Sequence, residues 1–346
     1  MLTASDEVEV TQPDIMSSQR SWGRHLRNPY LTIWPATLVL FAVSPLIAPG
    51  SMGVGALQGT LPFAAFLAIV SIGQTLVIQQ RGLDLSVPGV VSLSAIIVVL
   101  MPSPSGSGLF TAIVVALGAS ALAGMVSGVA VTRLGITPLV ATLAVNALLL
   151  GTVLQITRGG ANGTATPALT SFAIGRVLGV PHVVIVAVVA TALVAVLVRV
   201  TRIGRTFVAV GTSAAAGNAA GMQVRRYTLT TYIVASVLYG LAGILLAGYL
   251  RTPGLTIGNS YLLPSIAAVV LGGTSLAGGA GSVLATGAGA LFLTQLQQVV
   301  FAAGAPTSVQ LLIQSSVIGI GMAVRTVSWR HGWRRRGSRP VAATTS

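Results

Sequence analysis

Residues 109–157 read LFTAIVVALGASALAGMVSGVAVTRLGITPLVATLAVNALLLGTVLQIT. Two apolar stretches, 109–131 and 136–157, are separated only by the short segment TRLG, and Arg133 is the one charged residue among them. About 20 apolar residues are enough for an α-helix to cross the roughly 30 Å hydrocarbon core of a bilayer. The segment therefore predicts two membrane-spanning helices joined by a short turn.

The same alternation of apolar stretches and short breaks continues along the chain. We expect about ten transmembrane spans, at 31–49, 56–79, 84–101, 109–131, 136–157, 181–198, 228–250, 263–277, 281–302 and 308–326. The third, eighth and ninth are rich in Gly, Pro and Ser, so we expect them to be short, tilted or partly re-entrant. The predicted fold class is an all-α polytopic membrane protein.

The composition excludes most other classes of protein. Of the 346 residues, 53% are apolar and 7% are charged, whereas a soluble domain carries about a quarter charged residues. All basic residues are arginine and cysteine is absent, which rules out disulfides, thiolate metal sites, Schiff-base lysines and a complete phosphate-binding P-loop. Asp84 is the only acid beyond Asp14. We therefore expect no catalytic residue, no metal site and no cofactor bound by this chain.

The arginines predict the orientation of the spans, because cytoplasmic loops carry an excess of basic residues. With the N-terminus inside, the outer loops hold only Arg158, Arg176 and Arg251. The inner segments hold Arg20, Arg24, Arg27, Arg81, Arg133, Arg199, Arg202, Arg205, Arg225, Arg226, Arg325, Arg330, Arg334, Arg335, Arg336 and Arg339. Both termini are therefore expected in the cytoplasm, and the net charge of +14 indicates orientation rather than nucleic-acid binding.

The chain is expected to divide into three regions. Residues 1–29 hold four of the five acids and few large apolar residues, which is typical of a disordered cytoplasmic tail. Residues 30–327 form the predicted transmembrane domain. Residues 328–346 are predicted to be a basic cytoplasmic tail that contacts anionic lipid.

The inner loop 199–227 contains an alanine-rich stretch bracketed by Gly211 and Gly221. Thr212 or Ser213 can cap the start of a short helix there, and Gly221 can end it in the left-handed conformation. A short helix held between arginine-rich arms could dock on another protein. The alternative is an ordinary charged loop, because orientation alone explains the arginines.

Asp84 stands between two predicted spans, in the segment RGLDLSVPG that covers residues 81–89. A carboxylate in a membrane region is a functional candidate by default. An aspartate shortly before Pro88 is also typical of a helix cap, and Arg81 could neutralise it. We favour a structural cap with an ion pair over an ion carrier, because one carboxylate without a partner makes a poor relay.

Neutral amides within the spans could line a path for a hydroxylated solute. The candidates are Gln74, Asn146, Gln155, Gln295, Gln297, Gln298, Gln310 and Gln314, and we favour Gln74, Asn146, Gln295 and Gln314. The alternative is that they only join helices, as most buried amides do. The small residues of 263–282 are interpreted as allowing close helix approach rather than phosphate binding, since no lysine is present to assist.

Five segments in order along residues 57–324 carry a family resemblance. They are IGQTLVI (72–78) with GLDLSV (82–87), ITPLVATL (136–143), TRIGRT (201–206), AAGMQVRR (219–226), and IAAVVLGGTSL (266–276) with GGAGS (278–282). Together they resemble the permease subunits of ribose-type ATP-binding-cassette (ABC) importers for monosaccharides, in the branched-chain amino acid/sugar permease superfamily.

The resemblance implies a multi-pass permease of the bacterial plasma (inner) membrane that is not an enzyme. It implies a second permease subunit in a homodimer or heterodimer, cytoplasmic ATPase subunits that bind ATP and Mg, and an extracytoplasmic solute-binding protein that delivers the sugar. The alternatives are a branched-chain amino-acid ABC permease and an ion-coupled secondary carrier. The segment that matches the family's ATPase-coupling helix consists of Gly211, Thr212, Ser213, Ala214, Ala215, Ala216, Gly217, Asn218, Ala219, Ala220 and Gly221, flanked by Arg205 and Arg225.

Overall fold

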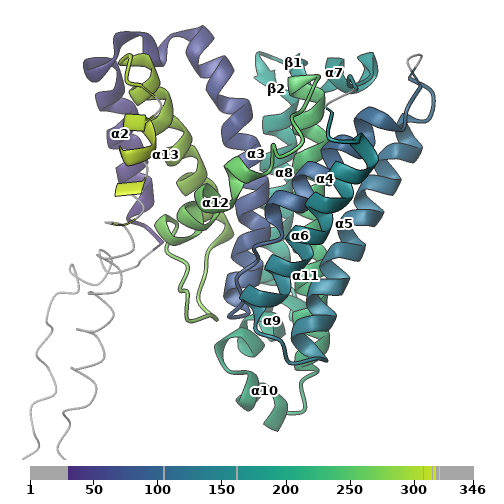
Figure 1. Cartoon of the computed structure of the whole chain (residues 1–346). Helices are drawn as coiled ribbons and strands as arrows, with labels where there is room; N and C mark the ends of the chain where they lie inside the picture. Colours follow the sequence, from purple (N-terminus) through teal and green to yellow (C-terminus); the bar gives the residue numbers. More distant parts are fainter. Residues whose placement is uncertain are drawn as a thin grey trace, which may run out of the picture.

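The computed structural model of the chain describes residues 30–103, 106–160, 163–306, 308–313, 315–316 and 319. Within these ranges the regular structure is helical, apart from the two-residue strands β1 (Arg176–Val177) and β2 (Val180–Pro181), which pair antiparallel. Figure 1 shows most helices lying side by side, with the β1–β2 hairpin and α7 at one end and α10 at the other. The predicted all-α class is confirmed for the described part of the chain.

Among the described residues, six helices are long and apolar enough to cross a membrane. They are α3 (Val54–Gln79), α5 (Leu109–Thr132), α6 (Pro138–Thr157), α8 (His182–Val200), α11 (Val224–Leu250) and α13 (Val283–Ala302). Three shorter apolar helices are α2 (Ile33–Ile47), α4 (Val87–Leu100) and α12 (Asn259–Leu271). The first nine predicted spans therefore each correspond to an apolar helix, while the tenth, 308–326, lies mostly outside the described residues. The count of ten and the cytoplasmic termini stay predictions.

Two of the three stretches expected to be short are short, since α4 has 14 residues and α12 has 13. The third, α13, is a continuous helix of 20 residues and so is not short. Its glycines allow neighbouring helices to approach: a Cβ at Gly289 would lie 2.5 Å from the backbone oxygen of Ala268 in α12. Small residues in this stretch therefore serve close packing and do not break the helix.

The connections between the long helices contain shorter ordered segments. They are the 3₁₀-helix η1 (Pro49–Met52) and the helices α7 (Pro167–Ile174), α9 (Arg202–Thr212) and α10 (Ala214–Ala219). Residues 158–180, between the fifth and sixth predicted spans, thus contain α7 and the start of the hairpin. Thr166 begins α7 by accepting a hydrogen bond from the Leu169 N–H at 3.4 Å.

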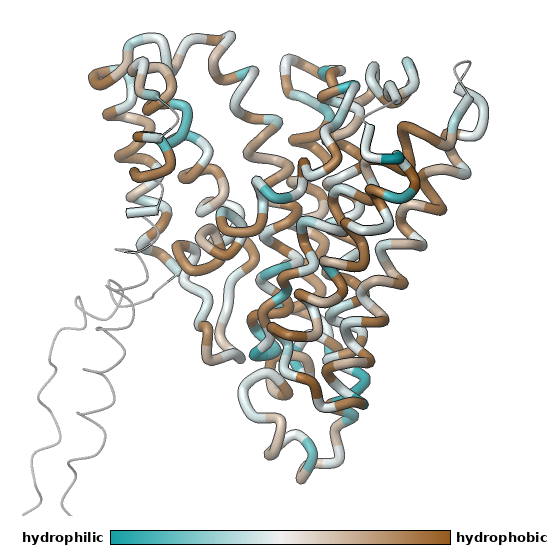
Figure 2. Tube along the Cα trace, viewed as in Figure 1, coloured by the Kyte–Doolittle hydropathy of each residue, from teal (hydrophilic) through white to brown (hydrophobic). Residues whose placement is uncertain are grey.

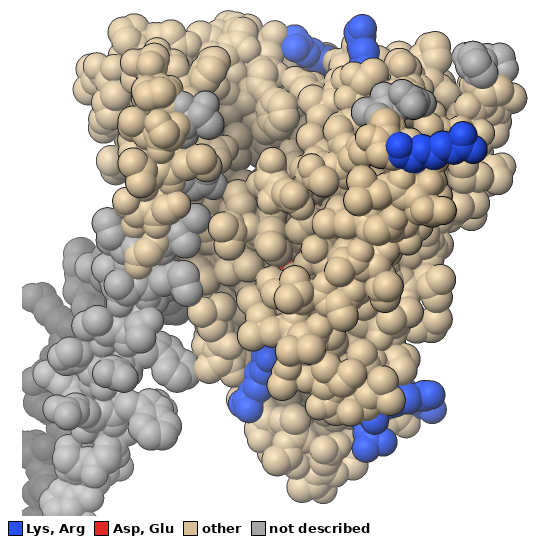
Figure 3. Space-filling model, viewed as in Figure 1, with Lys and Arg blue, Asp and Glu red and all other residues tan. Residues whose placement is uncertain are grey.

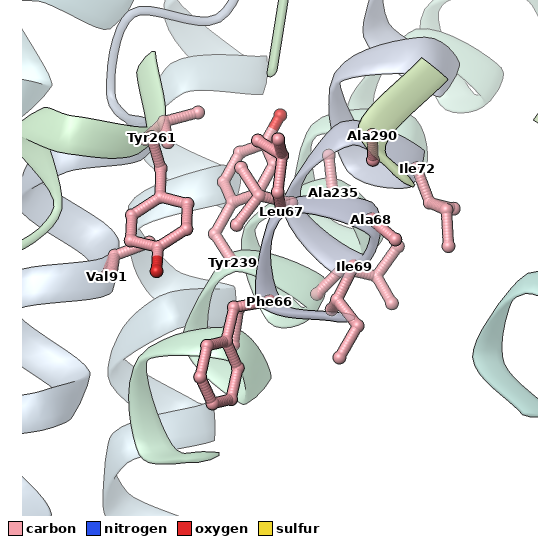
Figure 4. Close-up of a cluster of buried hydrophobic side chains, with 14 of the residues drawn as sticks. Phe66, Leu67, Ala68, Ile69, Ile72, Val91, Ala235, Tyr239, Tyr261 and Ala290 are labelled. Carbon is pink, nitrogen blue, oxygen red and sulfur yellow. The ribbon is translucent and has the colours of Figure 1, made fainter. Parts of the chain in front are cut away.

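The centre of the molecule is formed by α3 and α11, which are buried along most of their length. Figure 4 shows Phe66, Ile69 and Ile72 of α3 in the same cluster as Ala235 and Tyr239 of α11. Hydropathic colouring is brown along most of the helices, and teal segments gather near their ends (Figure 2). Such a pattern is expected for helices whose middle parts lie in hydrocarbon.

The flanking helices α6 and α8 expose large apolar side chains. Leu143 and Leu148 of α6 are 55% and 68% exposed, and Val188 and Leu193 of α8 are 61% and 58% exposed. A soluble protein rarely leaves so much apolar surface in contact with water. These faces therefore suit lipid or a second membrane subunit.

Candidate functional site

The segment 199–227 forms two helices at the end of the molecule opposite the β1–β2 hairpin (Figure 1). The first, α9, is amphipathic, because Gly204 and Phe207 are buried whereas Arg205 is exposed. Thr201 begins this helix by accepting a hydrogen bond from the Gly204 N–H at 3.0 Å. A rigid helix therefore occupies much of the segment that the sequence predicted as a loop.

The predicted alanine-rich helix is α10, which forms the extremity of its end of the molecule (Figure 1). Ser213 caps it, since the Ser213 hydroxyl accepts a hydrogen bond from the Ala216 N–H at 3.2 Å. Gly221 follows its last turn with φ +73°, a left-handed conformation that glycine adopts without strain. Its exposed residues are Ala214, Ala215, Ala216, Asn218 and Ala219. α10 therefore presents a small, mostly apolar surface.

Two predicted boundary residues have other positions. Gly211 lies in the last turn of α9 rather than at the start of the short helix, and a Cβ there would overlap the backbone oxygen of Gln79. Thr212 ends α9, and its hydroxyl donates to the Val208 carbonyl at 2.8 Å, so Ser213 alone is the cap. Arg225 is exposed in the first turn of α11.

Asp84 is fully buried in the break between α3 and α4. One oxygen of its carboxylate accepts hydrogen bonds from the Ser86 N–H at 2.9 Å and from the Ser86 hydroxyl at 2.6 Å. It therefore stabilises the turn that leads to α4, and bonds none of the amides inside the helix as a cap would. The expected ion pair is absent as well, because the Arg81 guanidinium donates to the carbonyls of Gly211 and Thr212.

Three of the predicted pathway amides, Gln74, Asn146 and Gln295, each join two helices. Gln74 of α3 accepts a hydrogen bond from the Tyr239 hydroxyl of α11 at 3.0 Å. Asn146 of α6 accepts from the Gly89 N–H of α4 at 2.8 Å, and Gln295 of α13 donates to Ser44 of α2 at 3.1 Å. Gln314 lies outside the described residues. These bonds match the second interpretation from the sequence, in which the amides hold helices together.

Two cavities lie near the hairpin end of α3 and α11. The hairpin cavity, about 300 Å³, is lined by Gln58, Pro62, Ala173, Ile174, Arg176, Pro181, Tyr249 and Arg251. The α12 cavity, about 260 Å³, is lined by Phe63, Leu67, Leu246, Leu250, Ile257, Ser260, Tyr261, Pro264, Thr294 and Gln297. Of the amides that the sequence singled out, Gln297 lines the α12 cavity. The two cavities are neighbours, because Pro62 and Arg251 line the hairpin cavity while the adjacent residues Phe63 and Leu250 line the α12 cavity.

An aromatic cluster stands between these two cavities. The rings of Phe63 and Tyr249 meet edge to face with centroids 5.5 Å apart, and Phe66 contacts both of them. Phe63 lines one cavity and Tyr249 the other. Aromatic faces next to amide and hydroxyl groups can bind the apolar and polar faces of a small hydroxylated solute. Helical spacing alone does not distinguish these residues from core aromatics, so the sequence did not identify them.

Arginines gather at the two ends of the described structure. Figure 3 shows blue side chains at both ends of this face and a broad tan surface between them. The α10 end carries Arg81, Arg133, Arg199, Arg202, Arg205, Arg225 and Arg226, while the hairpin end carries Arg158, Arg176 and Arg251. The excess lies at the end that the sequence assigns to the cytoplasm.

Comparison with known proteins gives a consistent result. The model of a family described as "Branched-chain amino acid transport system / permease component" matches residues 56–321. The ribose import permease of Escherichia coli (strain K12) is 33% identical over 293 residues, which cover 84% of this chain and 91% of the relative. A probable ABC transporter permease of Sinorhizobium fredii is 31% identical over 87% of this chain and 89% of its own. The galactofuranose transporter permease of Escherichia coli (strain K12) is 32% identical, with shares of 88% and 91%. No solved structure matches the chain.

Proposed function

The chain belongs to the branched-chain amino acid transport system / permease component family and is a permease of an ABC importer, and from this premise we propose that its cargo is a monosaccharide. Separate ATPase subunits drive the transport, and a solute-binding protein delivers the sugar from outside. Two permease subunits form the membrane part, in the bacterial plasma membrane. The chain itself binds no ATP.

The observation that carries the coupling part of this proposal is the surface of α10. Its exposed face consists of small side chains on a helix whose start is fixed by Ser213 and whose end is fixed by Gly221. Alanine loses no side-chain entropy on docking, so a rigid alanine surface binds a complementary groove at low cost. Exposed arginines on α9 and on the first turn of α11 flank it. We infer that α10 inserts into a groove on the ATPase.

The sugar is supported by the relatives and by the chemistry of the α12 cavity. Two of the three relatives are named for ribose or galactofuranose. The cavity offers the Tyr261 hydroxyl, the Ser260 hydroxyl and the Gln297 amide beside the Phe63 ring. These groups suit hydroxyls and a C–H face in one small molecule, and they supply no charge that an amino acid's ammonium and carboxylate groups would need.

Affinity purification of this chain from its native membrane tests the coupling proposal. We expect an ABC ATPase to copurify with the unmodified chain and to be lost from the double variant Ala215→Glu with Ala219→Arg. Ala303→Glu, which places a carboxylate on an exposed alanine just after α13, is the matched control and should retain the ATPase. Equal recovery of the ATPase with the α10 double variant would refute docking through α10.

The cargo is tested on the solute-binding protein that stimulates the purified complex. Ribose, xylose, galactose and rhamnose are compared with leucine and valine for their effect on its melting temperature. A ligand at about 100 times its Kd stabilises a protein by about 2.7 kcal/mol. We expect one of the sugars to give this stabilisation, and stabilisation by leucine or valine alone would overturn the sugar assignment.

A further inference from the structure

Three segments that are far apart in the sequence meet at the end of α3. The first is 79–81, where α3 ends; the second is the end of α9; the third is the glycine-rich loop 278–281 that precedes α13. The backbone carbonyl of Gln79 accepts a hydrogen bond from the Gly279 N–H at 2.8 Å. The Gln80 side-chain amide donates to the Phe207 carbonyl of α9 at 2.7 Å.

Arg81 completes this junction with its side chain. Its Nε donates to the Gly211 carbonyl at 3.1 Å, and Nη2 donates to the Thr212 carbonyl. These are the last carbonyls of α9, which have no partner within the helix and carry the negative end of its dipole. α10 is capped by the next residue, Ser213. Arg81 therefore holds the chain at the point where α9 turns into α10.

Glycines make the close contact at the junction possible. A Cβ at Gly279 would lie 2.5 Å from the Thr212 hydroxyl oxygen and 2.8 Å from the Thr212 Cα. A Cβ at Gly278 would overlap the Arg81 side chain and lie 2.9 Å from the Gly211 carbonyl oxygen. Only residues without a side chain allow the loop to lie between Arg81 and the end of α9.

The backbone of Arg81 is left-handed, with φ 63°. This conformation costs energy for every residue except glycine, and glycine would adopt it freely. The bonds from the guanidinium to α9 compensate for this cost. A second bond ties the same loop to α8, because the Arg199 guanidinium donates to Ser282, the cap of α13, at 2.9 Å.

We propose that Arg81 is a positioning residue that fastens the ATPase-coupling helices α9 and α10 to α3 and to the loop before α13. Movement of α10 then reaches α3 and α13, two of the four helices that line the α12 cavity, through this junction. The inference rests on the proposed function, because it assigns an internal route to coupling that begins at α10. The proposal predicts that a broken junction leaves ATPase binding and ATP hydrolysis intact. ATP binding and hydrolysis then no longer change the conformation of the cavities between the helices.

Arg81→Gly is the informative variant, because it removes the guanidinium and also relieves the left-handed backbone. If the guanidinium bonds only offset the strain of the Arg81 backbone, glycine would replace Arg81 without loss of stability or function. The chain has no cysteine, so Gln58→Cys places a single reactive thiol in the hairpin cavity. The complex is assembled in lipid nanodiscs, and the labelling rate of this thiol by a polar maleimide is measured before and after trapping with ATP and vanadate.

With Arg81 present, we expect trapping to change the labelling rate by about fivefold or more, as is typical of coupled sites. With Arg81→Gly we expect no change, although the copurified ATPase and its basal ATP hydrolysis are unaltered. Arg81→Lys, which keeps a cationic donor, should restore part of the response. Arg133→Gly is the control, since the exposed Arg133 side chain makes no hydrogen bond or ion pair within the described part of the chain, and it should respond fully.

A second pair of variants tests the junction from the loop side. Gly279→Ala and Gly135→Ala add the same methyl group at left-handed positions, with φ +73° and +68°. The added methyl meets Thr212 in the first and open space in the second. We expect Gly279→Ala to abolish the response to trapping and Gly135→Ala to preserve it.

The outcomes separate the two proposals. If no ATPase copurifies, or if trapping does not change the labelling in the protein that has Arg81, the proposed function fails and the role of Arg81 fails with it. If that protein responds, and both Arg81→Gly and Gly279→Ala respond equally, the proposed function stands and the junction is refuted.

Discussion

Gly124→Ala is expected to destabilise the protein, because α5 and α11 touch at this glycine. A Cβ there would lie 2.8 Å from the Ile233 Cα and 2.8 Å from the Ser236 hydroxyl oxygen, and would overlap the backbone oxygen of Tyr232. Carbon atoms pack best at about 3.5–4.0 Å, so α5 and α11 must separate by about 0.7 Å or more. Overpacking of this kind costs about 1–3 kcal/mol.

Gly118→Ala is the matched control for this change. Gly118 lies in the same helix, is exposed, and a Cβ there would have no atom within 4 Å. Without a clash, alanine in a helix interior is more favourable than glycine by about 0.5–1 kcal/mol. The two variants therefore make the same chemical change with opposite expected signs.

The assay is the apparent Tm in one detergent at one heating rate, because unfolding of a membrane protein is commonly irreversible and only such comparisons are meaningful. We expect Gly124→Ala to lower the apparent Tm by about 2–10 °C and Gly118→Ala to leave it unchanged or raise it slightly. Equal Tm values for the two variants would show that α5 and α11 are not in backbone contact at Gly124, and the packing described here would be wrong.

Three further predictions concern the site. Ser213→Ala should destabilise the start of α10 by about 1 kcal/mol and lower ATPase binding about fivefold in a pull-down titration. Thr212→Ala should leave ATPase binding unchanged, because the Thr212 hydroxyl donates within α9. Equal ATPase binding by both variants would contradict the role of Ser213 as the cap. Asp84→Asn should retain ATP-dependent uptake, since the amide oxygen can still accept from Ser86, while Asp84→Leu should lower the apparent Tm by leaving two donors unpaired, at about 1–3 kcal/mol each. Loss of uptake in Asp84→Asn at an unchanged Tm would instead indicate an ion carrier. Gln297→Ala should lower uptake about fivefold at an unchanged Tm, because about 1 kcal/mol of hydrogen bonding to the solute is lost. Gln295→Ala should instead lower the Tm, because it removes the hydrogen bond from Gln295 to the Ser44 hydroxyl. Lower uptake at an unchanged Tm in Gln295→Ala, with unchanged uptake in Gln297→Ala, would refute the α12 cavity as part of the solute path.

The sequence predicted the features that depend on local pattern. Apolar length located the nine apolar helices, α2 to α6, α8 and α11 to α13, and the alternation of a hydroxyl residue, alanines and glycine located α10 between Ser213 and Gly221. These signals arise within about 20 consecutive residues. They are therefore readable without knowledge of tertiary contacts.

The predictions that were wrong required knowledge of distant contacts. Arg81 was expected to pair with Asp84, three residues away, but its partners at Gly211 and Thr212 are 130 and 131 residues away. Gln74 and Gln295 were candidates for the path because they are polar within apolar stretches; their bonds between helices depend on distant residues, and their part in the path stays a prediction. Of the residues that line the α12 cavity, the sequence indicated only Gln297, because the aromatic and hydroxyl residues there have the spacing of ordinary core positions.

Cross-linking from α10 tests the central claim of the account most directly. Because the chain has no cysteine, Ala215→Cys and Ala303→Cys each provide one attachment point for a photoactivated cross-linker. Illumination of native membranes should join the Ala215→Cys chain to an ABC ATPase subunit, and should yield no such product from Ala303→Cys. An absent ATPase product from Ala215→Cys, or equal products from both positions, would contradict coupling through α10.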